Sequence, residues 1–575
     1  MKQLFCMILV LILGLTGCSS KQRKKDHQMN VSVSGEQITI FLQDLGKSGD
    51  ADLYAYASND YYSTDPLRGI STNVEKTATK VGTYTCGDVK TIYRARYENN
   101  VDHLYDKYYL IQNGKIIKGP VYATTIASQK KSIGYKQTSI KGLFNESPSD
   151  MTIVDDAKVQ SVTINIDLAR LVYPNEDANG NVAVIPDMSL PMTVNGKTYY
   201  FNKDYVSEID AVTSQCAKRK VNVIAILVAW KESENYYPAA LKYDSPKSQA
   251  TLGFNTSNDL GRDYFIAMME FLGNRYSRND TIGYISNYVI SNEIDSTHYF
   301  YNCSNLNVFM EEYSRALRLA NLALKKYAAN IHVIVPFTHY WKGYAAKLGQ
   351  ETANTDSLRP YDELEWLVKQ TNARGAYDWG IAPHTYATVN TDSRYAYIDT
   401  KSGYLTGSYK TTKEITFTNF EVWKQYLSLP RVRYKGQFRN IYLTESGISS
   451  NKNTVENQKQ QAAAFAMAYY KVSQFSFVKA YNFYRTIDHE KETAFSLSCG
   501  LLQSDHSKKL IYDVYKFIDT NKTFDYADPY LSQLQYKKNG KIVTPKLWLE
   551  AMNIYNSGIN WNKEWSTSKI IKRQV

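Results

Sequence analysis

The sequence predicts an α/β protein: a (β/α)8 TIM barrel preceded by a small all-β, sandwich-like domain. From about residue 135, apolar, β-branched runs alternate with stretches of helical periodicity, eight times in order. The apolar runs are nearly continuous, which is typical of parallel strands buried on both faces. Residues 31–132 instead carry short alternating runs without a good helical pattern, which favours a β-sandwich.

The eight βα units are expected within residues 133–521. The expected strands are 139–144, 162–166, 221–228, 282–290, 331–335, 379–381, 441–443 and 477–483. The helices expected to follow them are 150–160, 204–218, 261–276, 307–327, 361–369, 420–427, 455–472 and 508–518. A doubly wound open sheet is the alternative, but it requires no particular number of units and would favour a phosphate-binding glycine loop, which the sequence lacks.

Turn signals complete this outline. Asn113-Gly114, between two apolar pairs, is a strong two-residue hairpin signal in the N-terminal domain. Residues 522–575 are expected to form an extension, with a second such turn at Asn539-Gly540 and a short helix over 547–552. Two long loops, 231–260 and 385–414, follow strands three and six. They leave the end of the barrel where active sites lie.

The first 18 residues resemble a lipoprotein signal peptide. Lys2 supplies a positive charge, and the apolar run 4–15 is too short to span a bilayer comfortably. The run ends in Leu15-Thr16-Gly17-Cys18, which resembles a lipobox and implies lipidation of Cys18; an ordinary cleaved signal with a chance cysteine is the alternative. Residues 19–30, rich in Lys and Arg, are expected to be a tether. The protein is therefore expected to be extracytoplasmic, anchored to the bacterial cell membrane as a lipoprotein.

Composition narrows the possible partners. The formal charge of +12 is spread over the whole chain without a basic stripe, so no nucleic-acid partner is expected. The spacing of Cys86, Cys216, Cys303 and Cys499 fits neither a metal knuckle nor a dense disulfide framework, so core thiols with one possible disulfide are expected. The 49 tyrosines have flat apolar faces with polar tips, which suit sugars; a Tyr-rich secreted surface explains the same count.

Two glutamates fall at the ends of expected strands. Glu293 follows strand four in Ser291-Asn292-Glu293, and Glu445 follows strand seven in Leu443-Thr444-Glu445. Barrel closure would bring both to the same mouth. One glutamate at a strand end is most simply a salt-bridged rim residue, but two at these strands favour chemistry. Glycoside hydrolysis needs two carboxyl groups: one protonates the leaving group, and in a retaining enzyme the other attacks the anomeric carbon.

This arrangement resembles the signature of clan A glycoside hydrolases over most of residues 135–520. Besides Asn292-Glu293 and Glu445, Pro383-His384-Thr385-Tyr386 after strand six is similar to the clan's His-x-Tyr. Gly500-Leu501-Leu502, with Asp505 and Lys508-Lys509, resembles the stretch before and into the clan's last helix. The chain as a whole resembles a poorly characterised branch of bacterial lipoproteins with this barrel.

The resemblance implies a role for each matching residue. Glu293 is expected to be the acid/base and Glu445 the nucleophile. Asn292 is expected to contact the sugar 2-hydroxyl, Tyr386 to donate to the nucleophile and hold it ionised, and His384 to line the donor-sugar subsite. The acid is expected to have a raised pKa and the nucleophile a normal or lowered one.

The sequence also departs from the clan pattern. Asn-Glu is followed by Ile294-Asp295 rather than proline, strand eight ends in Tyr484-Arg485 rather than a Trp, and strand three ends in Trp230-Lys231 without a His. These departures leave the sugar, the linkage and endo or exo action open, and transglycosylation as open as hydrolysis.

Further substrate contacts are predicted around the mouth. Trp230 and Tyr484 are candidates for stacking on sugars, with core packing as the alternative. His339, after strand five, and Asn165, on strand two, are weaker candidates, and a structural role is the commoner explanation of such a His.

The leading hypothesis is a retaining glycosidase acting on a poly- or oligosaccharide at the cell surface. The alternatives are a catalytically inactive, glycan-binding surface lipoprotein and a structural surface protein in which the barrel is a spacer. No cofactor is expected, and no His-rich or Cys-rich cluster suggests a catalytic metal. Asn175–Asn181 is rich in Asn, Asp and Gly, but it lacks the terminal Glu of an EF-hand, so a plain loop is expected.

Overall fold

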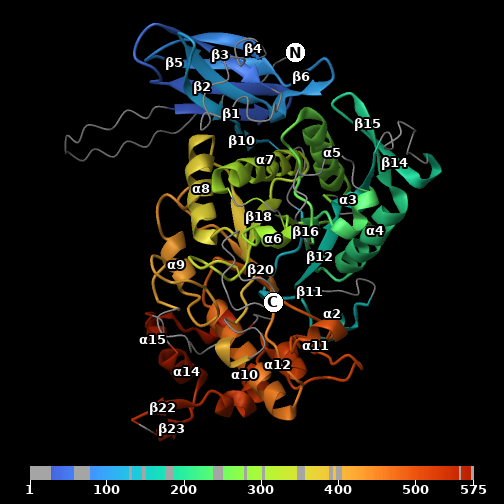
Figure 1. Cartoon of the computed structure of the whole chain (residues 1–575), viewed down its shortest axis with the longest axis vertical. Helices are drawn as coiled ribbons and strands as arrows, with labels where there is room; N and C mark the ends of the chain where they lie inside the picture. Colours follow the sequence, from blue (N-terminus) through green and yellow to red (C-terminus); the bar gives the residue numbers. More distant parts are fainter. Residues whose placement is uncertain are drawn as a thin grey trace, which may run out of the picture.

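The computed structural model describes residues 28–56, 78–127, 133–144, 150–174, 186–236, 250–277, 281–300, 303, 305–345, 357–387, 393–396, 405–539, 541–555 and 558–571. It confirms the predicted fold class, a closed eight-stranded parallel barrel with a β-domain before it (Figure 1). Cys18, the tether up to residue 27 and the loop Asn175–Asn181 lie outside the described residues.

The barrel closes because the last strand pairs with the first. Its strands, in spatial and sequence order, are β11 (Lys141–Phe144), β12 (Ser161–Asp167), β16 (Asn222–Val228), β17 (Asn287–Ile290), β18 (His332–Phe337), β19 (Trp379–Pro383), β20 (Ile441–Ser446) and β21 (Val478–Phe483). The helices that correspond to the predicted ones are α2 (Thr152–Asp156), α4 (Lys203–Lys218), α5 (Asp259–Arg275), α7 (Leu306–Lys325), α8 (Pro360–Ala373), α9 (Val422–Leu427), α10 (Val455–Val472) and α12 (Ile511–Phe517).

Two elements near the start of the barrel are shorter than predicted. Strand four was expected from residue 282, but β17 begins at Asn287, because the preceding stretch turns back on the end of α5, where Ile285 N donates to Tyr276 O (3.0 Å). The first helix ends at Asp156, and Lys158 adopts a positive φ of 53°, which a helix cannot continue through.

The barrel interior is a small apolar cluster, separate from the larger core between strands and helices. Side chains alternate along each strand, and one face of every strand points inward. The inward-facing cluster comprises Phe144, Ile224, Ile226, Val228, Val289, Ile334, Ala382, Tyr442 and Ala480. Trp230 and Tyr484 pack against this cluster beyond the carboxyl ends of β16 and β21, so both lie at the mouth of the barrel.

The N-terminal domain is built on two four-stranded sheets, in the orders β10-β1-β2-β5 and β4-β3-β8-β9, with a short two-stranded sheet of β6 (Tyr97–Glu98) and β7 (Val101–Asp102) beside them. Their strands are β1 (Gln28–Ser34), β2 (Gln37–Gln43), β3 (Asp50–Tyr56), β4 (Thr79–Thr85), β5 (Val89–Ala95), β8 (Lys107–Gln112), β9 (Lys115–Val121) and β10 (Ala123–Ile126). Asn113 and Gly114, both at positive φ, form the predicted hairpin turn between β8 and β9.

The N-terminal domain lies beside the helices α5, α7 and α8 (Figure 1), and buried polar contacts join it to them. Lys326, just after α7, forms ion pairs with Asp102 (2.9 Å) and with Glu270 of α5 (2.6 Å). The Tyr105 hydroxyl also donates to Glu270, and Tyr122 N donates to the carbonyl of Arg374 beyond α8 (3.0 Å). The β-domain is therefore attached by specific hydrogen bonds as well as by apolar contact.

One sheet was not predicted. Between β12 and α4, the segments β13 (Val172–Tyr173), β14 (Ser189–Val194) and β15 (Lys197–Asn202) form a three-stranded antiparallel sheet. Its hairpin turns at Asn195-Gly196, both at positive φ. This is the same Asn-Gly turn sequence that predicts the hairpin at Asn113-Gly114.

The C-terminal extension lies at the end of the molecule opposite the β-domain (Figure 1). It contains the expected hairpin, β22 (Tyr536–Lys538) and β23 (Lys541–Val543), and the expected helix α14 (Trp548–Ile554). Cys86, Cys216, Cys303 and Cys499 are all free, so the possible disulfide among them does not form. Within the described ranges, no helix combines the length and the apolar character needed to cross a membrane.

Candidate active site

A β-bulge aims Glu445 into the barrel mouth. Leu443 pairs with Tyr481 and Ser446 with Phe483, so β20 has one more residue than β21 over this interval. Tyr442 faces the barrel interior and Leu443 the outer core. Without the extra residue, strict alternation would turn Glu445 outward with Leu443. The bulge reverses the alternation, which is how bulges re-aim side chains next to active sites.

Glu293 sits in a loop whose backbone is held in an uncommon conformation. Ser291 and Glu293 both have positive φ, 71° and 31°. Such conformations cost free energy in residues other than glycine and persist only where surrounding contacts hold them. Ser296 N donates to Glu293 O (2.8 Å), and Ile294 N donates to Pro336 O in β18 (3.3 Å).

Asp295 anchors this loop to Thr338, which follows β18. Its carboxyl group is fully buried and accepts hydrogen bonds from Thr338 N (2.9 Å) and the Thr338 hydroxyl (2.5 Å). Leu358 N donates to the Asp295 carbonyl (3.0 Å). Burial raises the pKa of Asp295 to about 7, although the Thr338 hydrogen bonds oppose this rise. Asp295, one residue after the position where the clan pattern has proline, therefore clamps the loop after β17 to the loop after β18.

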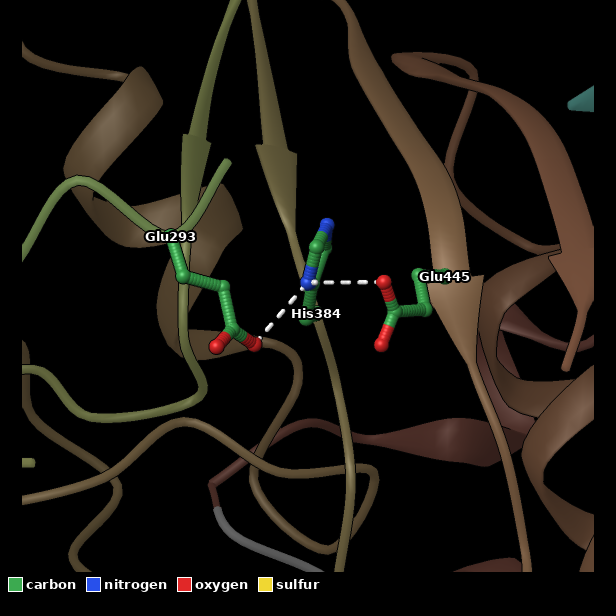
Figure 2. Close-up of side chains that lie close together, drawn as sticks. All are labelled: Glu293, His384 and Glu445. Atoms are coloured by element: carbon green, nitrogen blue, oxygen red, sulfur yellow. Dashed lines mark hydrogen bonds and ion pairs between the residues drawn. The ribbon is translucent and has the colours of Figure 1, made fainter. Parts of the chain in front are cut away.

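His384 connects the two glutamates (Figure 2). Its Nδ1 atom lies 3.0 Å from Glu293 Oε1 and 3.6 Å from Glu445 Oε2. The imidazole is fully buried, whereas each glutamate side chain is 21% exposed, so the carboxyl groups remain open to a ligand. The Tyr386 hydroxyl donates to Glu445 Oε1 (2.9 Å), as the resemblance implied.

The charges in this group shift its pKa values. Burial raises the pKa of the Glu445 carboxyl, and the Glu293 carboxylate adds to the rise, while His384 and the Tyr386 hydrogen bond oppose it. The net shift is upward, whereas the resemblance implied a normal or lowered pKa for this group. Burial alone would lower the pKa of His384, but the Glu445 and Glu293 carboxylates outweigh it and raise that pKa.

The two predicted asparagines lie at different depths. Asn292 is 9% exposed, and its Oδ1 atom has no hydrogen-bond partner in the part of the chain that is described. Asn165 is exposed, yet it pairs with Ile226, whose side chain faces the barrel interior. The exposure of an inward-facing side chain shows that the barrel mouth is open at β12.

The predicted aromatic residues are both half-buried at the mouth. The Tyr484 ring contacts Tyr386 edge-to-face, with 6.4 Å between the ring centroids. Its hydroxyl donates to Glu492 (2.8 Å), which also pairs with Arg485 (2.9 Å). Glu492, on the short helix α11 (Glu490–Ala494), was not predicted, because nothing in its local sequence marks it as part of the mouth. Trp230 N donates to Asp167 Oδ1 (3.2 Å), which fixes the start of the loop after β16.

His339 lies beside the glutamates as a neutral residue. Burial lowers the pKa of His339 to about 4; the Glu293 carboxylate partly opposes this shift, and His384 adds to it. The ring stacks on Tyr340 at a centroid distance of 4.5 Å. His339 directly follows Thr338 of the Asp295–Thr338 clamp, which places it next to the acid/base candidate.

A buried ion pair holds together the loops after β20 and β21. Lys509 Nζ contacts Asp488 (2.9 Å), the Ser450 hydroxyl (3.0 Å) and the Ser498 carbonyl (3.0 Å). Both charged side chains are fully buried. Lys509 comes from the stretch that resembled the clan's last helix, and its role here is to fix the loop that carries Cys499 and Gly500 beside the site.

Glu293, His384 and Glu445 are also the one group that has metal-ligand spacing among the described residues. One ligand atom from each residue lies within 4.8 Å of the others. An imidazole with two carboxylates is a donor set that zinc accepts. The same geometry lets the three residues share a proton between an acid and a base.

Residues 134–541 match a family model described as a family of unknown function (DUF5722), and no curated protein matches the chain. Similar solved structures include a family 39 glycoside hydrolase from the gut symbiont Bacteroides cellulosilyticus WH2 (14% identity, TM-score 0.41, covering 85% of this chain and 82% of that chain). Others are a glucosidase from Croceicoccus marinus (12%, 0.39, 70% and 70%) and a GH5_18 protein from Streptomyces cattleya in complex with GlcNAc (12%, 0.38, 68% and 80%).

Proposed function

The chain belongs to DUF5722, a family of unknown function, and we propose that this member is a glycoside hydrolase that cleaves a poly- or oligosaccharide with retention of configuration. One observation carries the proposal: Glu293 and Glu445 meet at the barrel mouth, where one carboxylate oxygen of each lies within 4.8 Å of one carboxylate oxygen of the other. Retaining enzymes hold their carboxyl groups about 5–5.5 Å apart, and inverting enzymes about 6.5–9.5 Å apart. The short separation favours direct attack by one carboxylate over activation of a water between the two.

Each step of the proposed reaction uses one of these groups. Glu445 attacks the anomeric carbon, and the bond to the leaving oxygen breaks as Glu293 donates its proton to that oxygen. This leaves a glycosyl ester on Glu445 and a Glu293 carboxylate. Glu293 then takes a proton from water, whose oxygen attacks the anomeric carbon and releases Glu445.

Three neighbouring residues orient the two glutamates and the sugar during these steps. The Tyr386 hydroxyl aims one oxygen of Glu445, and the other, Oε2, which lies 3.6 Å from His384 Nδ1, makes the attack. His384 supplies positive charge between two carboxylates that would otherwise repel each other. Asn292, which directly precedes Glu293 and matches the clan residue that contacts the sugar 2-hydroxyl, is assigned that contact here.

We further propose that the enzyme works at the outer surface of the bacterial membrane, anchored through lipid on Cys18. The support is the lipobox-like Leu15-Thr16-Gly17-Cys18 and the basic tether behind it. Cys18→Ser in the full chain is expected to abolish incorporation of a labelled fatty acid, and continued labelling would contradict the anchor.

Azide rescue tests the assignment of the two glutamates. With an activated aryl glycoside, Glu445→Gly and Glu293→Gly should each lose at least about 100-fold in kcat. Azide should restore turnover in both variants, giving a glycosyl azide of inverted configuration with Glu445→Gly and of retained configuration with Glu293→Gly. Glu270→Gln, a buried glutamate at the β-domain contact, serves as the control. Wild-type activity in either glycine variant would reject the proposal.

A further inference from the structure

The outer face of the sheet β10-β1-β2-β5 consists of residues that share one side of the register. On each strand, alternate residues such as Val31, Ile40 and Ile92 are buried against the second sheet. The residues between them face outward, and the strand pairing brings them together. We call them the neutral face: Gln28, Asn30, Ser32, Ser34, Gln37, Thr39, Phe41, Gln43, Val89, Thr91, Tyr93, Ala95 and Thr125.

None of these residues is charged, although 22% of the chain is Asp, Glu, Lys or Arg. The charged residues of β5, Lys90 and Arg94, lie on the opposite side of the strand. The outer side of the second sheet is different, since Lys80 and Asp52 form an ion pair there (2.8 Å). The absence of charge is therefore a property of one face and not of the whole domain.

Rings and polar groups alternate across the neutral face. Tyr93 is 63% exposed and Val89 64%, while Phe41 is half-buried. Thr39 pairs with Tyr93 and Phe41 with Thr91, so the two rings are diagonal neighbours, within reach of one ligand. The hydroxyl and amide groups of Thr39, Thr91, Gln37 and Gln43 make no side-chain hydrogen bond to any described residue, so they are available to a ligand.

We propose that the neutral face binds a chain of uncharged sugars, at a site separate from Glu293 and Glu445. Sugar rings present apolar C–H faces edged by hydroxyls, and exposed aromatic rings with neutral hydrogen-bonding groups between them match both features. The absence of charge favours an uncharged ligand, because a nucleic acid or an anionic membrane would require cationic side chains. A seven-residue strand gives the face a length of about 20 Å, enough for several sugar units.

Affinity electrophoresis of the full chain tests this site. The Glu445→Gln variant, which the proposed function expects to bind a substrate without turning it over, is run through native gels. Three gels contain barley β-glucan, konjac glucomannan or xylan, and a fourth contains polygalacturonate. Retardation is expected in at least one neutral gel. Adding Tyr93→Ala is expected to weaken this retardation at least fivefold, and adding Tyr93→Ala with Phe41→Ala at least tenfold.

Two controls separate this site from the barrel. Tyr54→Ala removes a ring from the outer side of the other sheet and should leave retardation unchanged. Tyr93→Ala in the otherwise wild-type chain should leave hydrolysis of a small aryl glycoside unchanged, so a failure of binding and a failure of catalysis can be told apart. The proposal is overturned if no neutral polymer retards the protein, if polygalacturonate retards it more, or if folded Tyr93→Ala binds as tightly as its parent.

Discussion

Removal of the Tyr386 hydroxyl is expected to weaken catalysis while leaving the barrel folded. This hydroxyl donates a 2.9 Å hydrogen bond to Glu445 Oε1, and hydrogen bonds to charged groups contribute about 1.5–3 kcal/mol. Since about 1.4 kcal/mol corresponds to a factor of ten, Tyr386→Phe should lower kcat/KM about 10- to 150-fold. The hydrogen bond also opposes the rise in the pKa of Glu445. Its loss should therefore move the acidic limb of the pH profile towards higher pH.

The assay is the pH dependence of kcat/KM for an activated aryl glycoside, measured for the wild type and Tyr386→Phe. Tyr515→Phe is the matched control, because the buried Tyr515 hydroxyl donates to a neutral acceptor, the Gly142 carbonyl (2.7 Å). It should lower the melting temperature without moving the pH profile. If Tyr386→Phe keeps wild-type kcat/KM and an unmoved acidic limb while remaining folded, the assignment of Glu445 as the ionised nucleophile is refuted.

Three further predictions concern the surroundings of the site. Asp295→Leu should lower kcat at least about tenfold with little change in KM, whereas Asp295→Asn, which can still bond to both Thr338 groups, should retain most of the activity; equal kinetics for the two variants would count against the clamp. Lys509→Met leaves the buried Asp488 carboxylate unpaired and should cost about 3–5 kcal/mol in urea unfolding, and a loss below about 1 kcal/mol would contradict this. Folding raises the pKa of His384, so the protonated imidazole stabilises the folded protein fully below about pH 6.5. This stabilisation is lost as the pH rises through the folded-state pKa. His384→Gln should remove that part of the pH dependence of thermal unfolding, and an unchanged pH dependence would contradict it.

The order of the barrel strands could be predicted because the signals are local. Each strand is a short apolar run, and each candidate glutamate directly follows one, so closure alone places Glu293 and Glu445 at one mouth. The sheet β13–β15 could not be predicted in the same way, although Asn195-Gly196 marks its turn, because a hairpin inserted between a strand and its helix leaves the alternation of βα units unchanged.

The details of the site could not be predicted, because they depend on contacts between distant segments. The bulge before Glu445 is visible only in its pairing with β21. The bridge through His384 requires three strand ends to meet. Asp295 was noticed only as a departure from a pattern, and its function as a clamp depends on Thr338, which lies on a different strand end. The net upward pKa shift of Glu445 likewise follows from burial, which no motif reports.

Trapping of a glycosyl-enzyme tests the central claim most directly. Residues 19–575 are incubated with a panel of activated 2-deoxy-2-fluoro glycosides, followed by intact mass measurement and peptide mapping. We predict a mass increase of one fluoro-sugar on the peptide that contains Glu445, absent in Glu445→Gln, and the reactive member of the panel would name the sugar that is cleaved. An adduct on another residue, or no adduct across the panel with folded protein, would contradict a retaining mechanism with Glu445 as its nucleophile.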